Sequence, residues 1–444
     1  MSNTATASRR TFLKASAFTV APLILPSRIF GADAPSKRIN IGMIGIGRQA
    51  YNPNLTQFLA EKDCHVMAVC DVDAWRMEQG RLKVQEYYAK RNIPSSCKTY
   101  KDFRDLLADK DIDAVMISTP DHWHTPMAVA AVLAGKDVAL EKPITRYIDE
   151  GRLLASLCEK HKRIFRVDSE FRSREAMHKA AELVRNGRIG TVRVMRTGSP
   201  TEVFPNESEE VTPPPADLDY NMWLGPAPEV AYIQKRVHTP RNLKTRPGWM
   251  RNLDYCDGMI TNWGTHLNDI AQWGNATDRT GPVEVKATGV FHAGKVWNVL
   301  ERFDAWYRYE NGCELFYQMG EPHVRFEGEK GWIQVNYSGR EFGGSQQLNA
   351  SDPALLADLG PDALRFPLKS EKRDFLDSVK ARTQTLEDAE VGQRTTSLCH
   401  IAHACIKRGG VKLRWDPVKE VFPDDAEANA LLKRPPMRAP WKMG

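Results

Sequence analysis

The fold of this chain is decided by one stretch, Ile39-Asn40-Ile41-Gly42-Met43-Ile44-Gly45-Ile46-Gly47-Arg48-Gln49-Ala50. An apolar run leads into Gly-x-Gly-x-x-Ala, and a helical pattern follows over residues 54–61. The first glycine permits a tight turn, the second lets backbone N–H groups approach a pyrophosphate, and the small third residue lets the helix pack close to the strand. This order predicts a dinucleotide-binding α/β domain.

The next apolar run, residues 65–70, ends in Asp71. A carboxylate at the tip of the second strand accepts hydrogen bonds from a ribose diol and repels a 2′-phosphate. Asp71 therefore favours NAD over NADP as the cofactor. Two nearby cations, Arg48 and Arg76, leave NADP possible.

Strands and helices continue to alternate through the first part of the chain. Short helices are expected at residues 100–107, 126–134 and 150–162, and strands at residues 114–118, 138–140 and 165–167. The loops after parallel strands meet at one edge of the sheet, where open α/β sheets bind ligands. Thr119, Pro120, His122 and His124 stand in one such loop. The two histidines either line the nicotinamide pocket or cap the following helix.

The strand at residues 138–140 ends in Glu141-Lys142-Pro143. The proline keeps the backbone of the lysine extended and stops a helix from starting there. Lys142 is thus a cation fixed at the cofactor edge, suited to donate or accept a proton. The alternative is a surface lysine before a turn.

Beyond Gly190 the apolar residues alternate with period two, at residues 192–196, 283–291, 303–309, 313–318 and 332–335. Successive strands without helices between them predict an antiparallel sheet, and hence an α+β second domain. We expect an export signal at residues 1–34, a Rossmann domain at 35–168, and an α+β substrate and oligomerisation domain at 169–444. The long excursion after the first of these strands is either functional or disordered.

A second informative segment contains Asn262, His266 and Asp269 at i, i+4 and i+7, which places them on one face of a predicted helix. A histidine with polar neighbours on one face suits general acid–base work. The alternative is a core histidine with structural partners.

The N-terminus reads Ser8-Arg9-Arg10-Thr11-Phe12-Leu13-Lys14, followed by a short apolar run and Ala32-Asp33-Ala34. Paired arginines, an apolar core and a small-x-small site predict a twin-arginine signal and a periplasmic protein. The alternatives are an uncut anchor or a chance Arg-Arg pair. The formal charge of the chain is +6, and half of it lies in this segment, so we expect no nucleic-acid binding.

The eight cysteines form no Cys-x-x-Cys pair, and no His/Cys cluster has zinc spacing. We therefore predict no metal site and no specific disulfide. The N-terminal apolar run is too short to span a bilayer, so no stable membrane anchor is expected.

With these pieces together, the chain resembles the glucose–fructose oxidoreductase/inositol dehydrogenase (Gfo/Idh/MocA) family from Lys37 onward. The resemblance rests on the glycine turn, Asp71, Thr119-Pro120, Glu141-Lys142-Pro143 and the spacing Gly258…His266. The segment at residues 223–228, Trp-Leu-Gly-Pro-Ala-Pro, and the proline-rich residues 433–436 resemble the exported branch of that family.

The resemblance implies that Lys142 hydrogen-bonds the reacting hydroxyl and that His266 removes its proton. Many dehydrogenase relatives carry an aspartate where this chain has Asn262, and an amide orients a hydroxyl without holding an imidazolium by charge. We expect substrate contacts from Glu170, Arg172, Trp249 and Asp257. The expected cofactor-binding residues are Gly45, Ile46, Gly47, Arg48, Asp71, Thr119, Pro120, His124, Glu141 and Lys142.

The implied activity is oxidation or reduction of a sugar or polyol hydroxyl with tightly bound NAD that is recycled within the site, since an exported enzyme has no pool of free NAD. A redox-neutral glycoside-cleaving or lyase-like enzyme is the first alternative, and a non-catalytic carbohydrate-binding protein is the second. The expected partners are a small sugar or polyol, the twin-arginine export machinery, and further copies of the chain.

Overall fold

The computed structural model describes residues 38–338 and 344–443. The predicted export signal, residues 1–34, lies outside the described residues. Within the described ranges, no helix is both long and apolar enough to cross a membrane. The eight cysteines are buried thiols.

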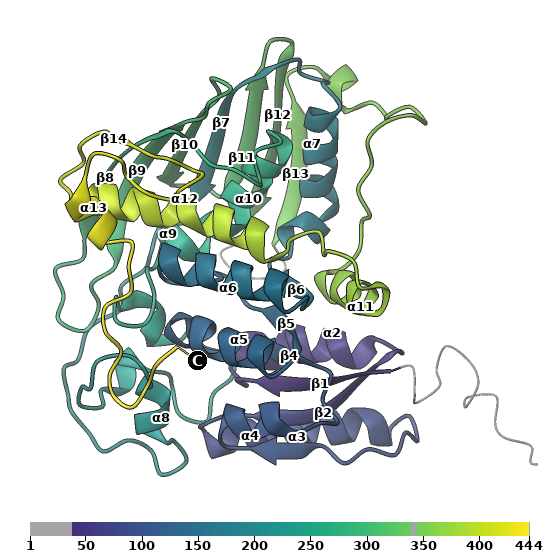
Figure 1. Ribbon diagram of the computed structural model, residues 1–444, viewed down its shortest axis with the longest axis vertical. Coiled ribbons are helices and arrows are strands. Elements are labelled where there is room, and N and C mark those ends of the chain that lie inside the picture. Colours follow the sequence, from purple (N-terminus) through teal and green to yellow (C-terminus); the bar gives the residue numbers. More distant parts are fainter. Residues whose placement is uncertain (1–37, 339–343, 444) are drawn as a thin grey trace, which may run out of the picture. The chain divides into compact units, whose positions relative to one another are not determined.

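The first sheet has six parallel strands in the order β3-β2-β1-β4-β5-β6 (Figure 1). Its strands are β1 Ile39–Ile44, β2 Cys64–Cys70, β3 Lys98–Tyr100, β4 Ala114–Ile117, β5 Asp137–Leu140 and β6 Phe165–Val167. The strand order reverses between β1 and β4, and the crevice at such a switch point is where doubly wound sheets bind their ligands.

Helices cover both faces of this sheet. The core on one face is built from the sheet, α2 Leu55–Ala60, α3 Ala74–Ala89 and α11 Glu371–Ala381. The other face packs against α4 Phe103–Ala108, α5 His124–Leu133 and α6 Ile148–Lys160. The predicted dinucleotide-binding fold is confirmed.

Two of the predicted boundaries were wrong. Tyr100 closes β3 and does not begin a helix; α4 starts at Phe103, because the carboxylate of Asp102 caps it by accepting from the N–H of Arg104 at 2.9 Å. The helix predicted from residue 54 is preceded by a π-helical turn, Ala50–Asn54, that holds Pro53.

The second sheet has eight strands in the order β13-β12-β11-β7-β10-β9-β8-β14. They are β7 Val192–Ser199, β8 Glu284–Phe291, β9 Leu300–Arg308, β10 Glu314–Met319, β11 His323–Gly328, β12 Gly331–Ser338, β13 Ser345–Ala350 and β14 Leu413–Arg414. All neighbours are antiparallel except β7 and β10, which are parallel. This confirms the α+β second domain, with β11, β13 and the two-residue β14 as strands that the sequence pattern did not predict.

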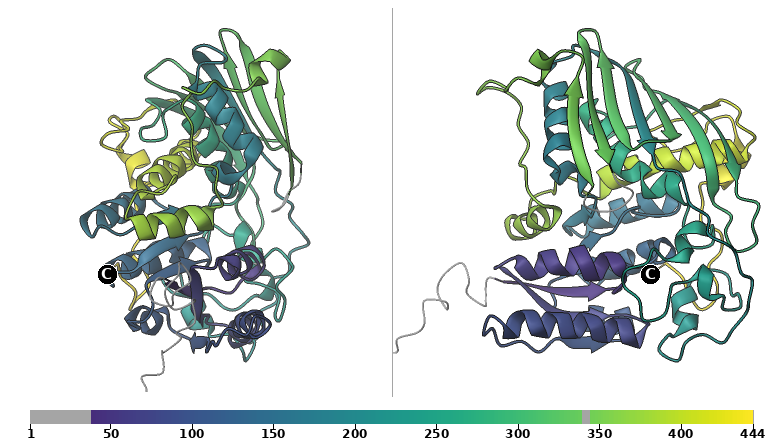
Figure 2. Two further views of the ribbon diagram at one scale, coloured as in Figure 1. Left: turned by 90° about the vertical axis from the view of Figure 1, so that its right-hand side faces the viewer. Right: turned by 180° about the vertical axis from the view of Figure 1, so that it is seen from behind.

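Three helices, α7 Glu175–Arg185, α10 Gly264–Gly274 and α12 Ala389–Lys407, pack on one face of this sheet and share its core, and Figure 2 shows the sheet from other sides. Shorter helices are α8 Tyr220–Leu224, α9 Met259–Asn262 and α13 Ala426–Ala430. The break between α9 and α10 bears directly on the site described below.

The chain returns to the first domain near its end. Phe375 and Leu376 of α11 are fully buried in the core of the parallel sheet. The ammonium group of Lys372 donates to Oδ1 of Asp168 at 2.6 Å and to Oδ1 of Asn54 at 3.0 Å. A helix inside the predicted bounds of the second domain therefore completes the first.

Candidate functional site

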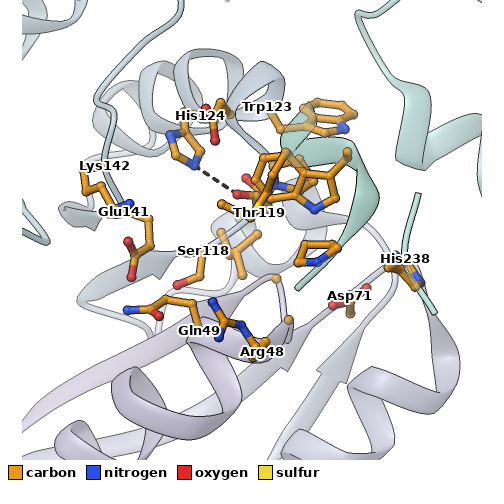
Figure 3. Close-up of a pocket in the computed structure, with 18 of the residues that line it drawn as sticks. Arg48, Gln49, Asp71, Ser118, Thr119, Trp123, His124, Glu141, Lys142 and His238 are labelled. Carbon is orange, nitrogen blue, oxygen red and sulfur yellow. Dashed lines mark hydrogen bonds between the residues drawn. The ribbon is translucent and has the colours of Figure 1, made fainter. Parts of the chain in front are cut away.

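One pocket lies at the carboxyl edge of the parallel sheet and is closed by residues of the second domain. Figure 3 shows Asp71 and His238 toward one end of this pocket, and Glu141, Lys142 and His124 toward the other. The pocket brings together most of the residues that the sequence singles out: Gly45, Gly47, Arg48, Asp71, Thr119, Pro120, His124, Glu141, Lys142, Glu170, Trp249, Asn262 and His266.

The glycine turn has the geometry that its sequence predicts. Gly45 has a φ of +83°, and a Cβ there would lie 2.8 Å from the carbonyl oxygen of Ser118. A Cβ at Gly47 would meet nothing within 4 Å. The turn thus leaves its backbone open on the pocket side at Gly47.

Asp71 holds this turn in place. Its Oδ2 accepts from the backbone N–H of Ile46 at 2.6 Å, and its Oδ1 accepts from that of Asp73 at 2.8 Å. Burial raises the pKa of Asp71, while these two N–H groups and Arg76 oppose the rise. Ile46 itself does not line the pocket, since its side chain is buried in the core and its N–H is bound to Asp71.

The pocket wall also contains a polar group that is free to hydrogen-bond a ligand. The hydroxyl of Thr119 is buried and has no hydrogen-bond partner within the described ranges. Polar groups buried in that way are usually satisfied by a ligand or water. Together with the open turn at Gly47 and the carboxylate of Asp71, this hydroxyl fits a bound dinucleotide.

A segment of the long excursion, residues 236–250, crosses to the first domain and is called the strap below. Five of its residues line the pocket: His238, Thr245, Pro247, Trp249 and Met250. Near its middle, the carbonyl oxygen of Leu243 accepts from the side-chain amide of Asn52 at 3.1 Å. The excursion is thus part of the site.

The strap is tied to the N-terminal end of α3 by polar side chains. Nε2 of His238 lies 3.1 Å from Oδ2 of Asp73. The guanidinium of Arg76 donates to the carbonyl oxygens of Asn242 at 2.8 Å and Thr239 at 3.4 Å. Arg76 is therefore held by strap carbonyls beside Asp71.

Lys142 follows β5 and precedes a cis peptide bond to Pro143. Its ammonium group donates to the main-chain carbonyl of Asn262 at 2.9 Å. Burial lowers the pKa of Lys142, although Glu141 and Glu170 oppose this change. The lysine spans the gap between the two domains.

His266 is held by the three residues that follow β6 closely. Nδ1 lies 2.7 Å from the hydroxyl oxygen of Ser169, and the ring stacks on Phe171 with centroids 4.7 Å apart. Nε2 lies 3.9 Å from Oε2 of Glu170. Burial lowers the pKa of His266 well below its ordinary range, and Lys142 and Arg174 lower it further. The imidazole is therefore neutral at pH 7.

The two histidines after β4 have different places. His124 lines the pocket, and its ring nitrogens lie 2.7 Å from the carbonyl oxygen of Pro143 and 3.0 Å from that of Thr119. It braces two strand-end loops. His122 lies outside the pocket lining, with Nε2 3.0 Å from the carbonyl oxygen of Trp223.

The prediction of one continuous helical face was wrong. Asn262 ends α9, Trp263 interrupts the helix, and His266 lies in α10. Asn262 and His266 still line one pocket, but Asp269 is directed to Arg172 and lies outside the pocket lining.

Arg172 and Asp257 do not line the pocket, so the structure does not bring them together with the other predicted substrate contacts. The guanidinium of Arg172 donates to both carboxylate oxygens of Asp269 at 2.7 Å, and its side chain is 1% exposed. Burial would raise the pKa of Asp257, but Arg146 and His403 bring it well below its ordinary value. Both side chains belong to buried ion pairs. Their partners are distant in the sequence, so the sequence alone could not identify these pairs.

Several pocket residues were not predicted as site residues: Asp121, Phe171, His238, Trp263 and Tyr337. Burial raises the pKa of Asp121 to about 8. Its position directly after Thr119-Pro120 was an available signal, as was that of Phe171 beside Glu170. No local pattern marked His238 or Tyr337, because they reach the pocket from distant parts of the chain.

These features define a dinucleotide-binding protein: a doubly wound parallel sheet, a glycine turn after its first strand, an acidic residue after its second strand and a pocket at the switch point. The chain belongs to the Gfo/Idh/MocA oxidoreductase family. Residues 39–169 match the family model described as "Oxidoreductase family, NAD-binding Rossmann fold", and residues 203–443 match "Oxidoreductase family, C-terminal alpha/beta domain".

Curated relatives match over part of their length. "Glycosyl hydrolase family 109 protein 2" of Shewanella sp. (strain ANA-3) is 31% identical over 160 residues, which are 32% of this chain and 35% of that protein. A family 109 protein of Saccharopolyspora erythraea is 34% identical over 126 residues, which are 28% and 27% of the two chains. The chain spans about a third of the length of the curated relatives it matches.

Solved structures match over nearly the whole described chain. The aldose-aldose oxidoreductase of Caulobacter crescentus complexed with glycerol aligns with a TM-score of 0.62 at 17% identity, covering 85% of this chain and 99% of that one. The scyllo-inositol dehydrogenase of Lactobacillus casei with NAD(H) and scyllo-inositol gives 0.57 at 17% identity, with the same coverage. These likenesses show a shared fold.

Proposed function

We propose that the protein is an NAD-dependent oxidoreductase that acts on a hydroxyl group of a sugar or polyol. The observation that carries the proposal is the pocket itself, which joins the glycine turn and Asp71 to the half-buried Lys142 and the buried His266. The names of the two solved structures, an aldose-aldose oxidoreductase with glycerol and a scyllo-inositol dehydrogenase with NAD(H), support the same substrate class.

The residues present fit NAD. Gly47 leaves room for a pyrophosphate, Asp71 faces the pocket as a ribose acceptor, and the hydroxyl of Thr119 is available for a hydrogen bond. When bound, the nicotinamide takes or returns the hydride. The remaining chemistry belongs to the chain's own side chains.

Lys142 and His266 are the groups that handle the hydroxyl proton. The ammonium group of Lys142 donates hydrogen bonds and orients the oxygen, while a neutral imidazole at His266 is able to accept a proton. Phe171, Trp263 and Tyr337 give this end of the pocket aromatic walls that exclude water and pack against a sugar ring.

The strap supports NAD over NADP. Arg76 is the cation best placed to meet a 2′-phosphate, but its guanidinium is held by the carbonyl oxygens of Thr239 and Asn242 and lies 3.5 Å from Asp73. With Arg76 held in this way, the buried carboxylate of Asp71 decides the preference.

The strap also supports a retained cofactor. It contributes five residues to the pocket wall and is tied to the Rossmann domain through His238, Arg76 and Asn52. Release of a dinucleotide requires these ties to open. We infer that one NAD molecule stays bound and is recycled between an oxidised and a reduced substrate.

The proposal includes export to the periplasm and self-association through the second sheet. Native mass spectrometry of the exported protein tests both, together with the cofactor. We expect NAD to be released on denaturation and more than one copy per particle. Recovery of NADP in place of NAD would contradict the cofactor assignment.

A second candidate is redox-neutral cleavage of a glycoside, in which the cofactor is reduced and reoxidised within one turnover. The observation that favours it is the name of the curated relatives, glycosyl hydrolase family 109. Release of p-nitrophenol from p-nitrophenyl glycosides without net NADH would support this candidate. Net NADH from a free sugar would support the first.

A further inference from the structure

Glu170 lies beside His266 because the residues on either side of it, Ser169 and Phe171, both contact the imidazole ring. Ser169, Glu170 and Phe171 are consecutive and begin two residues after the end of β6, and each lies against the imidazole: a hydroxyl at Nδ1, a carboxylate near Nε2 and a stacked ring. The wall that holds the histidine thus also presents a carboxylate to its pocket-facing nitrogen.

The spacing of the two groups suits one substrate oxygen. Nε2 of His266 and Oε2 of Glu170 are 3.9 Å apart, which is too far for a direct hydrogen bond. A hydroxyl oxygen about 2.8 Å from each atom fits across this gap at ordinary hydrogen-bond lengths. Both side chains line the pocket, so a sugar hydroxyl can reach that position.

Other carboxylates of the pocket are less suited to this role. Glu141 is bound to the side-chain amide of Asn54 at 2.8 Å, and Asp71 is bound to two backbone N–H groups. Asp121 also lines the pocket but makes no ion pair with His266 within the described ranges. Within the described ranges, Glu170 is the carboxylate that lies within 4.0 Å of the His266 ring.

We propose that Glu170 is a catalytic residue whose carboxylate receives the proton of the sugar hydroxyl, while His266 and Lys142 hold the oxygen. This inference rests on the proposed oxidoreductase activity and moves the role of proton acceptor, which the proposed function gives to His266, to Glu170. In the oxidative direction the O–H bond breaks, a new O–H bond forms on Glu170, the C–H bond gives up its hydride to NAD, and the alcohol becomes a carbonyl. The reductive direction returns the proton from Glu170.

The electrostatics of the pocket support this assignment. Burial raises the pKa of Glu170, the charge of Glu371 adds to the rise, and Lys142 and Arg174 oppose it. The pKa of His266 moves the opposite way. The charged and titratable groups that face Glu170 are Glu141, Lys142, Arg174, His266, Tyr337 and Glu371.

The decisive variant is Glu170→Gln, tested in the holoenzyme with its NAD. We expect kcat to fall about 100-fold or more, KM to change little, and the acidic limb of the kcat–pH profile to disappear. Glu175→Gln is the matched control, since Glu175 is an exposed carboxylate nearby that lies outside the pocket lining, and it should behave as wild type. The proposal would be overturned if the Glu170→Gln enzyme kept the acidic limb of its kcat–pH profile, or if only its KM rose while kcat stayed at the wild-type value.

Chemical rescue separates a proton acceptor from a substrate contact. Glu170→Ala should recover activity when formate is added, because a small carboxylate can occupy the space left by the side chain. Absence of rescue in a folded, NAD-loaded Glu170→Ala protein would count against the proposal. Glu170→Asp, the least disruptive variant, should retain an acidic limb that Glu170→Gln loses.

An infrared titration provides a readout that does not need turnover. The carboxyl band that is missing from Glu170→Gln should titrate above the ordinary glutamate range in the wild type. A band titrating in the ordinary range would overturn the inference. If no sugar or polyol is turned over by wild type, the proposed function fails, and the infrared result still reports on Glu170.

Discussion

The ammonium group of Lys142 is hydrogen-bonded to the main-chain carbonyl of Asn262, at 2.9 Å, and this contact joins the end of β5 to the end of α9. Because the acceptor is main chain, the lysine is held whichever side chain stands at position 262. The replacement of the usual aspartate by Asn262 therefore leaves the placement of Lys142 intact.

The first prediction concerns Lys142 itself. Lys142→Met removes the hydrogen-bond donor at the reacting end of the pocket, and we expect kcat to fall by about 10²- to 10⁴-fold while NAD stays bound. Steady-state kinetics and the NAD content of the purified variant measure the two effects. Lys101→Met is the control, because Lys101 lines the same pocket but is exposed; a similar loss in that variant would contradict the assignment.

The second prediction is a pH dependence. Burial lowers the pKa of Lys142, so a reaction that needs the protonated amine loses rate as pH rises through a value below the ordinary lysine pKa. Lys142→Arg keeps its charge at high pH and should move this alkaline limb upward, with a lower maximal rate. An unmoved limb would show that another group titrates.

The third prediction concerns the strap. His238→Ala removes the side chain that lies against Asp73, and we expect dissociation of NAD to quicken about fivefold, since the lost contact is worth on the order of 1 kcal/mol. Release is followed by trapping free NAD with a coupled enzyme. Lys244→Ala, on the exposed side of the strap, should release NAD at the wild-type rate.

The fourth prediction separates a structural arginine from a substrate contact. Asp269→Asn leaves the charge of Arg172 buried without its main partner, and we expect a loss of about 3–5 kcal/mol in the free energy of unfolding. Asp278→Asn is the control, because Asp278 meets the same guanidinium at 3.2 Å from a more exposed position; it should cost about 1 kcal/mol or less. Denaturant unfolding compares the two variants.

Local patterns predicted the parts of the fold that local physics decides. The glycine turn needs a positive φ at Gly45, and a buried parallel strand needs an apolar run such as residues 114–117, so both could be recognised in the sequence. The loops after β4 and β5 then had to share an edge, which brought Thr119 and Lys142 to one pocket.

Long-range partners were beyond the reach of such patterns. Arg172 and Asp257 are polar residues near motif positions, and only the packed structure shows Asp269 and Arg146 taking their charges. Strand β11 alternates polar residues with the buried Val324 and Phe326, so its period-two signal was present in the sequence, whereas β13 has no fully buried residue and gives no such signal. The long loop that holds the strap could be noticed in the sequence, but its contacts with the start of α3 could not be predicted from it.

The return of α11 to the parallel sheet has a consequence for how this protein is made. The core beside Phe58 lacks Phe375 and Leu376 until the ribosome has passed residue 376, late in synthesis. The cofactor domain therefore cannot finish folding ahead of the rest, as an N-terminal domain ordinarily does. For the same reason, a fragment cut at residue 168 will not serve as a transplantable nucleotide-binding module, whereas a graft that carries α11 with it has the apolar side chains that this core otherwise lacks.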